Sequence, residues 1–173
     1  MSARSTRLAI VALAAMLAGC SLPEKKEDAI RVQPPEKPKL SPVDQQREYA
    51  QAYERGLALA QRRDYGLALG YFERAVELNP ASIESRFALG ACYEQTGDPV
   101  RAIRQYRQIL EVHPDDADVF ANLGTAYVKL YEREHNKLWL AMARDAWERS
   151  LTLRPGQPDV RNYLASLDAR PRR

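Results

Sequence analysis

The sequence predicts an all-α fold in which a helical hairpin is repeated three times. Three glycines, Gly56, Gly90 and Gly124, recur at a constant spacing of 34 positions, and two prolines, Pro80 and Pro114, keep the same spacing. A fixed period of about 20 to 50 residues predicts units that bury a continuous core by stacking on their neighbours. The chain is therefore expected to fold as a helical solenoid.

Within each period the same residue types return in the same order: a glycine, an alanine, an aromatic residue and a proline. In the three copies these positions are Gly56, Ala68, Phe72 and Pro80; Gly90, Ala102, Tyr106 and Pro114; and Gly124, Ala143, Trp147 and Pro155. The pattern resembles the tetratricopeptide repeat (TPR), a family of two-helix hairpins. The resemblance implies a TPR solenoid with repeats at about 49–82, 83–116 and 117–157, in which glycine and alanine lie where two helices cross beside the aromatic ring.

The third repeat is longer than the other two. Pro155 follows Pro114 after 41 positions instead of 34, so seven residues are inserted. Seven residues make about two helical turns, so both helices lengthen without losing their shared face. The bend of this hairpin is expected near residues 134–136. Trp139 would lie on the extension, where packing against neighbours and binding a partner both remain open as its role.

Helix-capping residues mark the ends of the predicted elements. Ser41 before Pro42 and Asp98 before Pro99 predict helix starts, because a side-chain oxygen caps a helix and proline suits its first turn. Proline disfavours helical geometry in the residue before it, so second helices are expected to end at Asn79-Pro80, His113-Pro114 and Arg154-Pro155. The folded domain is thus expected over residues 41–170, with a solvating cap helix at about 158–169.

Residues 1–19 have the composition of a cleaved signal peptide. Arg4 and Arg7 precede an uncharged apolar stretch at residues 8–18, which is too short to span a bilayer as a helix, since that takes about 20 residues. The stretch ends in Leu17-Ala18-Gly19-Cys20, which resembles the lipobox of bacterial lipoproteins. The resemblance implies cleavage before Cys20, a diacylglycerol on its thiol, and a further acyl chain such as palmitate on its amine.

Residues 20–40 are expected to form a tether. Prolines interrupt a stretch that is rich in Lys and Glu and almost free of large apolar residues. Such a segment does not bury enough surface to offset its ordering entropy, so it should stay disordered and extended, reaching up to about 60 Å. Ser21, rather than Asp, follows the cysteine. In Gram-negative lipoproteins this favours sorting to the outer membrane, here with the domain facing the periplasm.

Charge and cysteine content exclude two classes of protein. Without Arg4 and Arg7 the 26 basic residues fall to 24, against 23 acidic ones, so the chain lacks the basic excess typical of nucleic-acid-binding proteins. With Cys20 lipidated, Cys92 is left alone, which excludes a disulfide framework. Cys92 is expected to be a buried, unreactive thiol.

No constellation for catalysis or metal binding is found in the sequence. His113 and His135 fall in different repeats, without a cysteine beside either, and do not match the spacing of metal ligands. A glycine-rich phosphate loop and a nucleophile elbow are also missing. We therefore expect no enzymatic activity, no metal site, no small-molecule substrate and no cofactor apart from the lipid on Cys20.

The TPR resemblance also implies a binding groove lined by the first helix of each hairpin. The corresponding residues are Tyr53, Leu57, Glu84, Phe87, Ala91, Asp118, Ala121 and Thr125. Some relatives grip a partner's C-terminal carboxylates with Lys, Asn and Arg. The equivalent residues here, Tyr53, Leu57, Ala88, Asp118 and Asn122, include no basic side chain, which excludes such a clamp. An apolar floor with Glu84 and Glu94 at its margin favours an apolar or amphipathic protein segment. Packing between repeats is the alternative role of Tyr53 and Phe87.

Together these features predict a membrane-anchored, non-catalytic scaffold for protein–protein interactions in cell-envelope assembly. Two alternatives remain open. One is a structural envelope component that self-associates through the open ends of its repeat array. The other is a factor resembling the pilotins, lipoproteins that assist secretin assembly for type IV pili.

Overall fold

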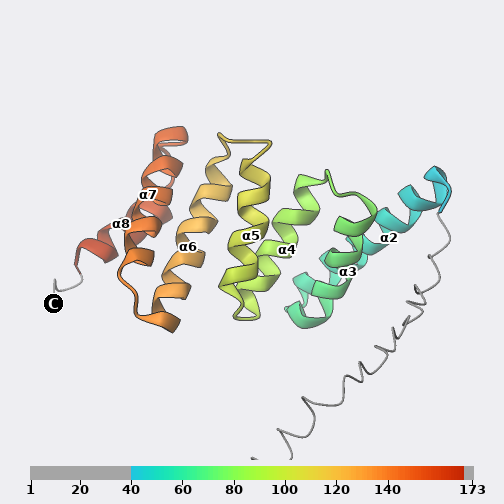
Figure 1. Ribbon diagram of the computed structural model, residues 1–173, viewed down its shortest axis with the longest axis horizontal. Helices are drawn as coiled ribbons and strands as arrows, with labels where there is room; N and C mark the ends of the chain where they lie inside the picture. The colour runs from blue at the N-terminus through green and yellow to red at the C-terminus, as the bar shows by residue number, and fades with distance from the viewer. Residues whose placement is uncertain (1–39, 170–173) are drawn as a thin grey trace, which may run out of the picture. The chain divides into compact units, whose positions relative to one another are not determined.

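The computed structural model describes residues 40–169, and within this range it is all-helical (Figure 1). The helices are α2 (Pro42–Gln61), α3 (Tyr65–Leu78), α4 (Ile83–Gln95), α5 (Pro99–Leu110), α6 (Ala117–Glu134), α7 (Leu138–Leu153) and α8 (Pro158–Asp168). The predicted all-α solenoid of three hairpins with a C-terminal cap helix is confirmed. The predicted signal peptide, the lipidated Cys20, the tether up to residue 39 and the last residues from Arg170 lie outside the described residues.

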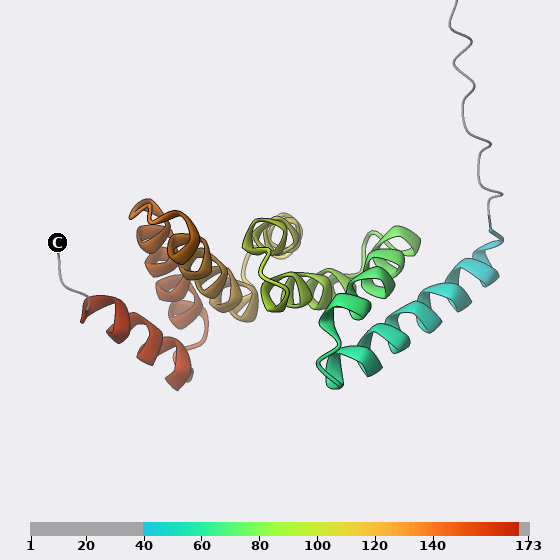
Figure 2. The same cartoon turned by 90° about the horizontal axis from the view of Figure 1, so that it is seen from below.

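The helices pack as hairpins that stand side by side in chain order. Helix α2 packs on α3, α4 on α5 and α6 on α7, while α3–α4 and α5–α6 contacts join successive hairpins. The cap helix α8 packs on α7, so α2 and α8 lie at opposite ends of the row (Figure 1, Figure 2). Contacts also join α2 to α4 and α4 to α6. The three first helices therefore form one continuous side of the array, which we call the first-helix face.

Side-chain caps begin most of these helices. The backbone N–H of Asp44 donates to Ser41 Oγ at 3.2 Å, and that of Arg101 donates to Asp98 Oδ1 at 3.0 Å. Both predicted caps are thus present. Two further caps lie at the starts of α4 and α6, where Ser82 and Asp116 accept backbone N–H bonds. Each cap satisfies an N–H group that has no partner inside its helix.

The three hairpins close on glycine–aromatic contacts. A β-carbon built on Gly56 would lie 2.7 Å from Cε1 of Phe72, and one on Gly124 would collide with the indole of Trp147. The rings of Phe72 and Trp147 are buried. These contacts are the close helix crossings that the repeating glycines predict. They explain why a residue without a side chain recurs at this position.

The inserted residues lengthen the third hairpin, as predicted. Helix α6 has 18 residues and α7 has 16, against 13 and 12 in the second hairpin. The bend lies at residues 135–137, where His135 ends α6 in the left-handed region with φ 54°. On the extension, the Trp139 ring stacks on Tyr127 with 6.0 Å between ring centroids. Trp139 is half-buried, so it packs without being enclosed.

Cys92 lies in the core of the second hairpin, as expected. Its side chain is buried, and burial raises the pKa of the thiol to about 11. A thiol with such a raised pKa carries little thiolate at neutral pH and is correspondingly unreactive.

Over residues 40–169 no helix is both long and apolar enough to cross a membrane.

Candidate functional site

The eight predicted groove residues come from the three helices of the first-helix face. Helix α2 carries Tyr53 and Leu57; α4 carries Glu84, Phe87 and Ala91; and α6 carries Asp118, Ala121 and Thr125. Leu57, Glu84 and Asp118 are exposed, and the other five are half-buried. All eight thus belong to the first helices of the hairpins, and none of them is enclosed in the core.

At the α2–α4 end of this face an aromatic pair lies beside a carboxylate. The rings of Tyr49 and Tyr53 stack with 6.2 Å between centroids. Burial raises the pKa of Tyr53, with smaller contributions from Tyr49 and from the negative charge of Glu84. Glu84 of α4 therefore lies close to the phenol of Tyr53 in α2. The two helices bring together residues that are 31 positions apart in the chain.

Tyr49 was not among the predicted groove residues. Its hydroxyl lies 2.9 Å from Ser82 Oγ, and Ser85 Oγ donates to it at 3.3 Å. Ser82 Oγ is also 3.1 Å from a carboxylate oxygen of Glu84. These bonds tie α2 to the start of α4. The signal that could have indicated Tyr49 is its spacing of four residues from Tyr53, which places both on the same helix face.

The two aromatic groove residues also pack inside their own hairpins. Tyr53 meets Phe72 edge-on at 5.9 Å, and Phe87 lies 5.8 Å from the ring of Tyr106. Both rings remain half-buried. The alternative role in packing is therefore real for these residues. Each one supports its hairpin and still presents part of its surface on the first-helix face.

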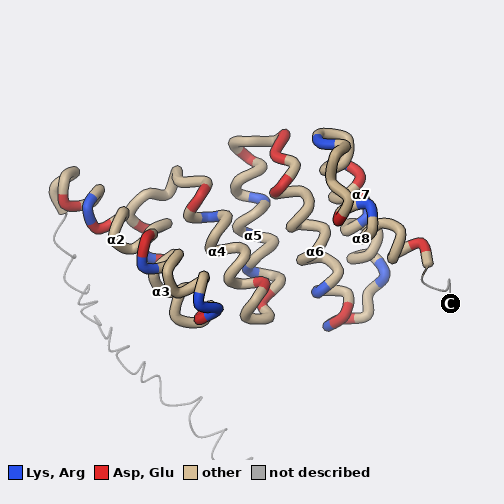
Figure 3. Tube along the Cα trace, turned by 180° about the vertical axis from the view of Figure 1, so that it is seen from behind, with Lys and Arg blue, Asp and Glu red and all other residues tan. Residues whose placement is uncertain are grey.

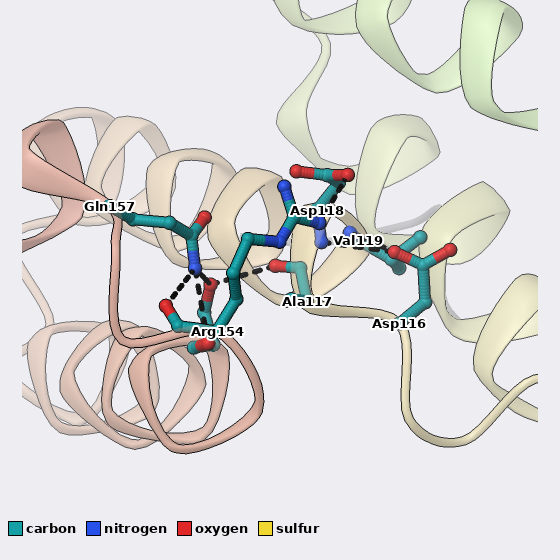
Figure 4. A network of polar contacts seen from close by, with 7 residues as sticks. Asp116, Ala117, Asp118, Val119, Arg154 and Gln157 are labelled. Atoms are coloured by element: carbon teal, nitrogen blue, oxygen red, sulfur yellow. Dashed lines mark hydrogen bonds and ion pairs between the residues drawn. The ribbon is translucent and has the colours of Figure 1, made fainter.

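At the α6 end of the face the polar groups are already partnered. Arg154 Nη2 donates to Asp118 Oδ2 at 2.6 Å, joining the end of α7 to the start of α6 (Figure 4). Thr125 Oγ1 donates to the carbonyl of Ala121 at 3.3 Å, and this carbonyl also accepts from Trp147 Nε1 at 2.9 Å. The charge of Asp118 is thus balanced, which leaves little unmatched polarity at this end.

The expected position of Glu94 on the groove margin is wrong. Its side chain is only 7% exposed and lies between α4 and α6. Lys129 Nζ is 3.5 Å from Glu94 Oε2 and donates to the Glu94 carbonyl at 3.0 Å. Burial raises the pKa of this carboxyl, against the opposing effect of Lys129. Glu94 is therefore part of the contact between two repeats and does not face a partner.

Basic and acidic residues alternate along the described helices (Figure 3). His113 and His135 are exposed, as expected for turn residues. Among residues 40–169 no group of three or more His, Cys, Asp or Glu side chains is arranged to hold a metal ion. Of the eight predicted groove residues, the exposed ones are Leu57 and the two carboxylates Glu84 and Asp118.

Comparison with known proteins agrees with this geometry. A tetratricopeptide-repeat family model matches residues 59–130. The photosystem I assembly protein Ycf3 of Prochlorococcus marinus (strain NATL2A) is 30% identical over an alignment of 138 residues that covers 73% of this chain and 80% of that protein. Ycf3 of Synechococcus sp. (strain CC9605) is 31% identical over an alignment of 140 residues that covers 74% of this chain and 81% of that protein. The chain belongs to the tetratricopeptide-repeat family.

Solved TPR structures have the same arrangement of helices. The second TPR domain of human RPAP3, in complex with an HSP70 peptide, is similar with a TM-score of 0.63 at 19% identity over 75% of this chain and all of that one. YrrB, described as a TPR protein with an unusual peptide-binding site, has a TM-score of 0.59 at 29% identity, covering 66% of this chain and 56% of YrrB. As a TPR protein, the chain is a protein-interaction scaffold.

Proposed function

We propose that this TPR chain is a lipid-anchored, non-catalytic scaffold that holds a segment of a partner protein on its first-helix face during cell-envelope assembly. One observation carries the proposal. Leu57 is 37% exposed, and the half-buried rings of Tyr53 and Phe87 belong to α2 and α4, two first helices that are in contact. Exposed apolar side chains that lie together mark surfaces for interaction.

The polar groups of the face indicate which partner it fits. Asp118 is already paired with Arg154, and the positions of a carboxylate clamp hold no basic side chain. Glu84 is exposed beside Tyr53. A partner segment with an apolar stripe and a basic residue near Glu84 would match these features. An apolar or amphipathic segment of a protein is therefore the occupant we propose.

The relatives support a role in assembly. The Ycf3 proteins are named for assembly of photosystem I. We propose that this chain likewise serves in assembly, by holding a segment of a protein partner. The proposed place of this activity is the periplasmic side of the outer membrane. That part of the proposal rests on the sequence Leu17-Ala18-Gly19-Cys20 and on Ser21.

Site-specific photocrosslinking tests the proposal. A photoactivatable amino acid at Leu57 should crosslink a protein partner in envelopes of the native organism. The matched control is Leu67 of α3, which is also an exposed leucine but lies on a second helix of the same hairpin. Capture from Leu57 and not from Leu67 is the expected result. Crosslinks from Leu67 alone would contradict the proposed face, and crosslinks to a second copy of the chain would favour the self-associating alternative.

A further inference from the structure

A second groove lies away from the first-helix face, between α5 and α7. It consists of two adjoining hollows of about 380 and 180 Å³. Arg107, Tyr127 and Met142 line both hollows, so the two are continuous. Helix α6 supplies the floor, and α5 and α7 supply the walls. This groove is separate from all eight residues predicted for the first-helix groove.

The lining of the groove is largely apolar. Val100 and Leu110 belong to its α5 wall, and Trp139 and Met142 belong to its α7 wall. From Val100 to Leu110 the α5 wall is about 15 Å long, at about 1.5 Å per residue. An α-helix of about three turns has this length, and an apolar stripe on such a helix would match the lining.

At the corresponding position one repeat earlier, the protein's own side chains are in polar contact with one another. There the hydroxyl of Tyr93 donates to Glu73 at 2.5 Å, and the guanidinium of Arg101 lies 4.8 Å above the Tyr93 ring. These three residues bridge α3, α4 and α5.

The equivalent three residues of the next repeat leave the groove open. Tyr127 and Arg107 are the counterparts of Tyr93 and Glu73 one repeat later, and Met142 is the counterpart of Arg101 once the insertion is allowed for. Arg107 offers no acceptor for the Tyr127 hydroxyl, and no hydrogen bond joins that hydroxyl to a residue in the described range. Met142 brings no cation. The polar contacts that join α3, α4 and α5 therefore have no counterpart among Arg107, Tyr127 and Met142, which line the groove.

The inserted residues extend this groove. Trp139 stacks on Tyr127 at 6.0 Å, and its Nε1 donates to Glu134 Oε2 at 2.9 Å. The stacking and the hydrogen bond both anchor the indole to α6 at the N-terminal end of the α7 wall, and Trp139 stays half-buried. The two roles left open for Trp139 by the sequence are therefore compatible: it packs on α6 and lines the groove.

The α5 border of the groove carries positive charge without a matching carboxylate. Arg101 pairs with Asp98, and on the opposite wall Arg149 pairs with Asp145. Arg104 and Arg107 have no ion pair with any carboxylate of residues 40–169. Both are exposed and lie one turn apart on α5. A partner with negative charge on that side would complement them.

We infer that the groove between α5 and α7 is a second docking site, for an amphipathic helix of a partner protein. The apolar stripe of this helix fills the groove, and carboxylates along one edge face Arg104 and Arg107. The site is independent of the first-helix face, so a scaffold with both could hold two protein segments at once.

The fluorescence of Trp139 provides a direct test with the purified full chain. The probe is a synthetic helical peptide of about four turns without tryptophan, with a leucine stripe edged by glutamates. Its twin carries lysines in place of the glutamates. The acidic peptide should shift Trp139 emission to shorter wavelength and bind about tenfold more tightly than the twin, a difference of about 1.4 kcal/mol. Trp147 is 3% exposed, and the variant Trp139→Phe should abolish the shift.

Three variants separate this groove from other surfaces. Ala141→Glu places a charge on an exposed lining residue and should abolish binding, whereas Ala165→Glu on exposed α8 should leave it unchanged. The double variant Arg104→Glu/Arg107→Glu should make the lysine twin the better ligand. Equal binding of the two peptides, or binding that survives Ala141→Glu, would overturn the inference. Loss of binding on Leu57→Asp would also overturn it, by assigning the peptide to the first-helix face.

Discussion

Gly90 of α4 lies against the ring of Tyr106 in α5, so closely that a β-carbon on Gly90 would be 2.6 Å from Cε1 of that ring. Tyr106 is fully buried and is among the largest side chains enclosed in the core. The ring therefore has little room to move. The second hairpin depends on a glycine here for space, and not for backbone freedom.

We predict that Gly90→Ala destabilises the protein by about 1–3 kcal/mol, the usual cost of overpacking a core. This loss should outweigh the gain of up to about 1 kcal/mol that alanine gives in a helix interior. Gly70→Ala is the matched control, because nothing lies within 4 Å of a β-carbon there. Thermal unfolding should show a lower Tm for Gly90→Ala and an unchanged or higher Tm for Gly70→Ala. Equal effects of the two substitutions would refute the close crossing.

Glu94 provides a prediction on pH. Burial raises its pKa in the folded protein above the ordinary value of 4.5, so the folded state binds this proton more tightly than the unfolded state does. The stabilisation from the bound proton is complete below the unfolded pKa and is lost as pH rises through the folded pKa. The amide of Glu94→Gln does not ionise, so the variant lacks the cost of a buried charge and should have a higher Tm than the parent at pH 7. This difference in Tm should disappear below about pH 4.5, where Glu94 of the parent is protonated.

Thermal melts of Glu94→Gln and the parent across this pH range check the prediction. Exposed Glu132 on α6 gives the matched control, because Glu132→Gln should change Tm little at any pH. A lower Tm for Glu94→Gln at every pH would show that the pair with Lys129 outweighs the burial of its carboxylate.

Ser150 gives a prediction on the third hairpin. Its side chain is completely buried, and its Oγ donates to the carbonyl of Ala117 at 2.7 Å and accepts from Gln157 Nε2 at 2.9 Å. One hydroxyl thus joins α6, α7 and the turn before α8. Ser150→Ala should cost about 1–2 kcal/mol in the free energy of unfolding, as expected for losing buried hydrogen bonds. Thr152→Ala, which removes an exposed hydroxyl bonded within its own helix, should cost clearly less in the same denaturant titration.

The hairpins were predictable because each one repeats a local physical requirement. Gly56 with Phe72 and Gly90 with Tyr106 are pairs of fixed spacing, and each lies within a single hairpin. The bend after Glu134 was predictable for a similar reason, since seven extra residues add whole helical turns to both helices. Properties set by one hairpin leave a periodic trace in the sequence.

Contacts that depend on three different helices leave no periodic pattern in the sequence. Glu94 was expected on the surface. Its burial involves Lys129 and Tyr106, which come from two other helices, so the repeat pattern of one hairpin does not reveal it. The groove between α5 and α7 was missed because it depends on what stands opposite Tyr127 after the insertion. Its only indications in the sequence are the changes from Glu73 to Arg107 and from Arg101 to Met142 between successive repeats.

The lipid anchor gives a prediction that does not depend on the fold. If Cys20 is the acylation site, Cys20→Ala should abolish incorporation of radiolabelled palmitate and prevent processing before residue 20. The substitution Cys92→Ala is the control, because its buried thiol should play no part in acylation. Continued labelling of Cys20→Ala would refute the lipoprotein proposal and leave the TPR scaffold unaffected.

The last prediction concerns capture of a partner on the first-helix face. Leu57 is exposed at the surface of α2, whereas Phe87 packs on Tyr106 inside its hairpin. Leu57→Asp should therefore weaken binding of the partner crosslinked from this position by about 2 kcal/mol, the usual scale of a hot spot, without changing Tm. Phe87→Glu should weaken binding and also lower Tm, because it removes a ring that belongs to the proposed face and packs inside its hairpin.

The exposed charge on the same face gives the control. Glu84→Lys should mainly alter the salt dependence of association, since charges at the margin of an interface contribute more to association rate than to affinity. Binding isotherms at two salt concentrations, measured beside thermal melts of each variant, separate these effects. If Leu57→Asp is fully folded and still binds the partner at full strength, the partner docks elsewhere. The groove between α5 and α7 would then be the next surface to examine, with Ala141→Glu as the variant that should abolish capture.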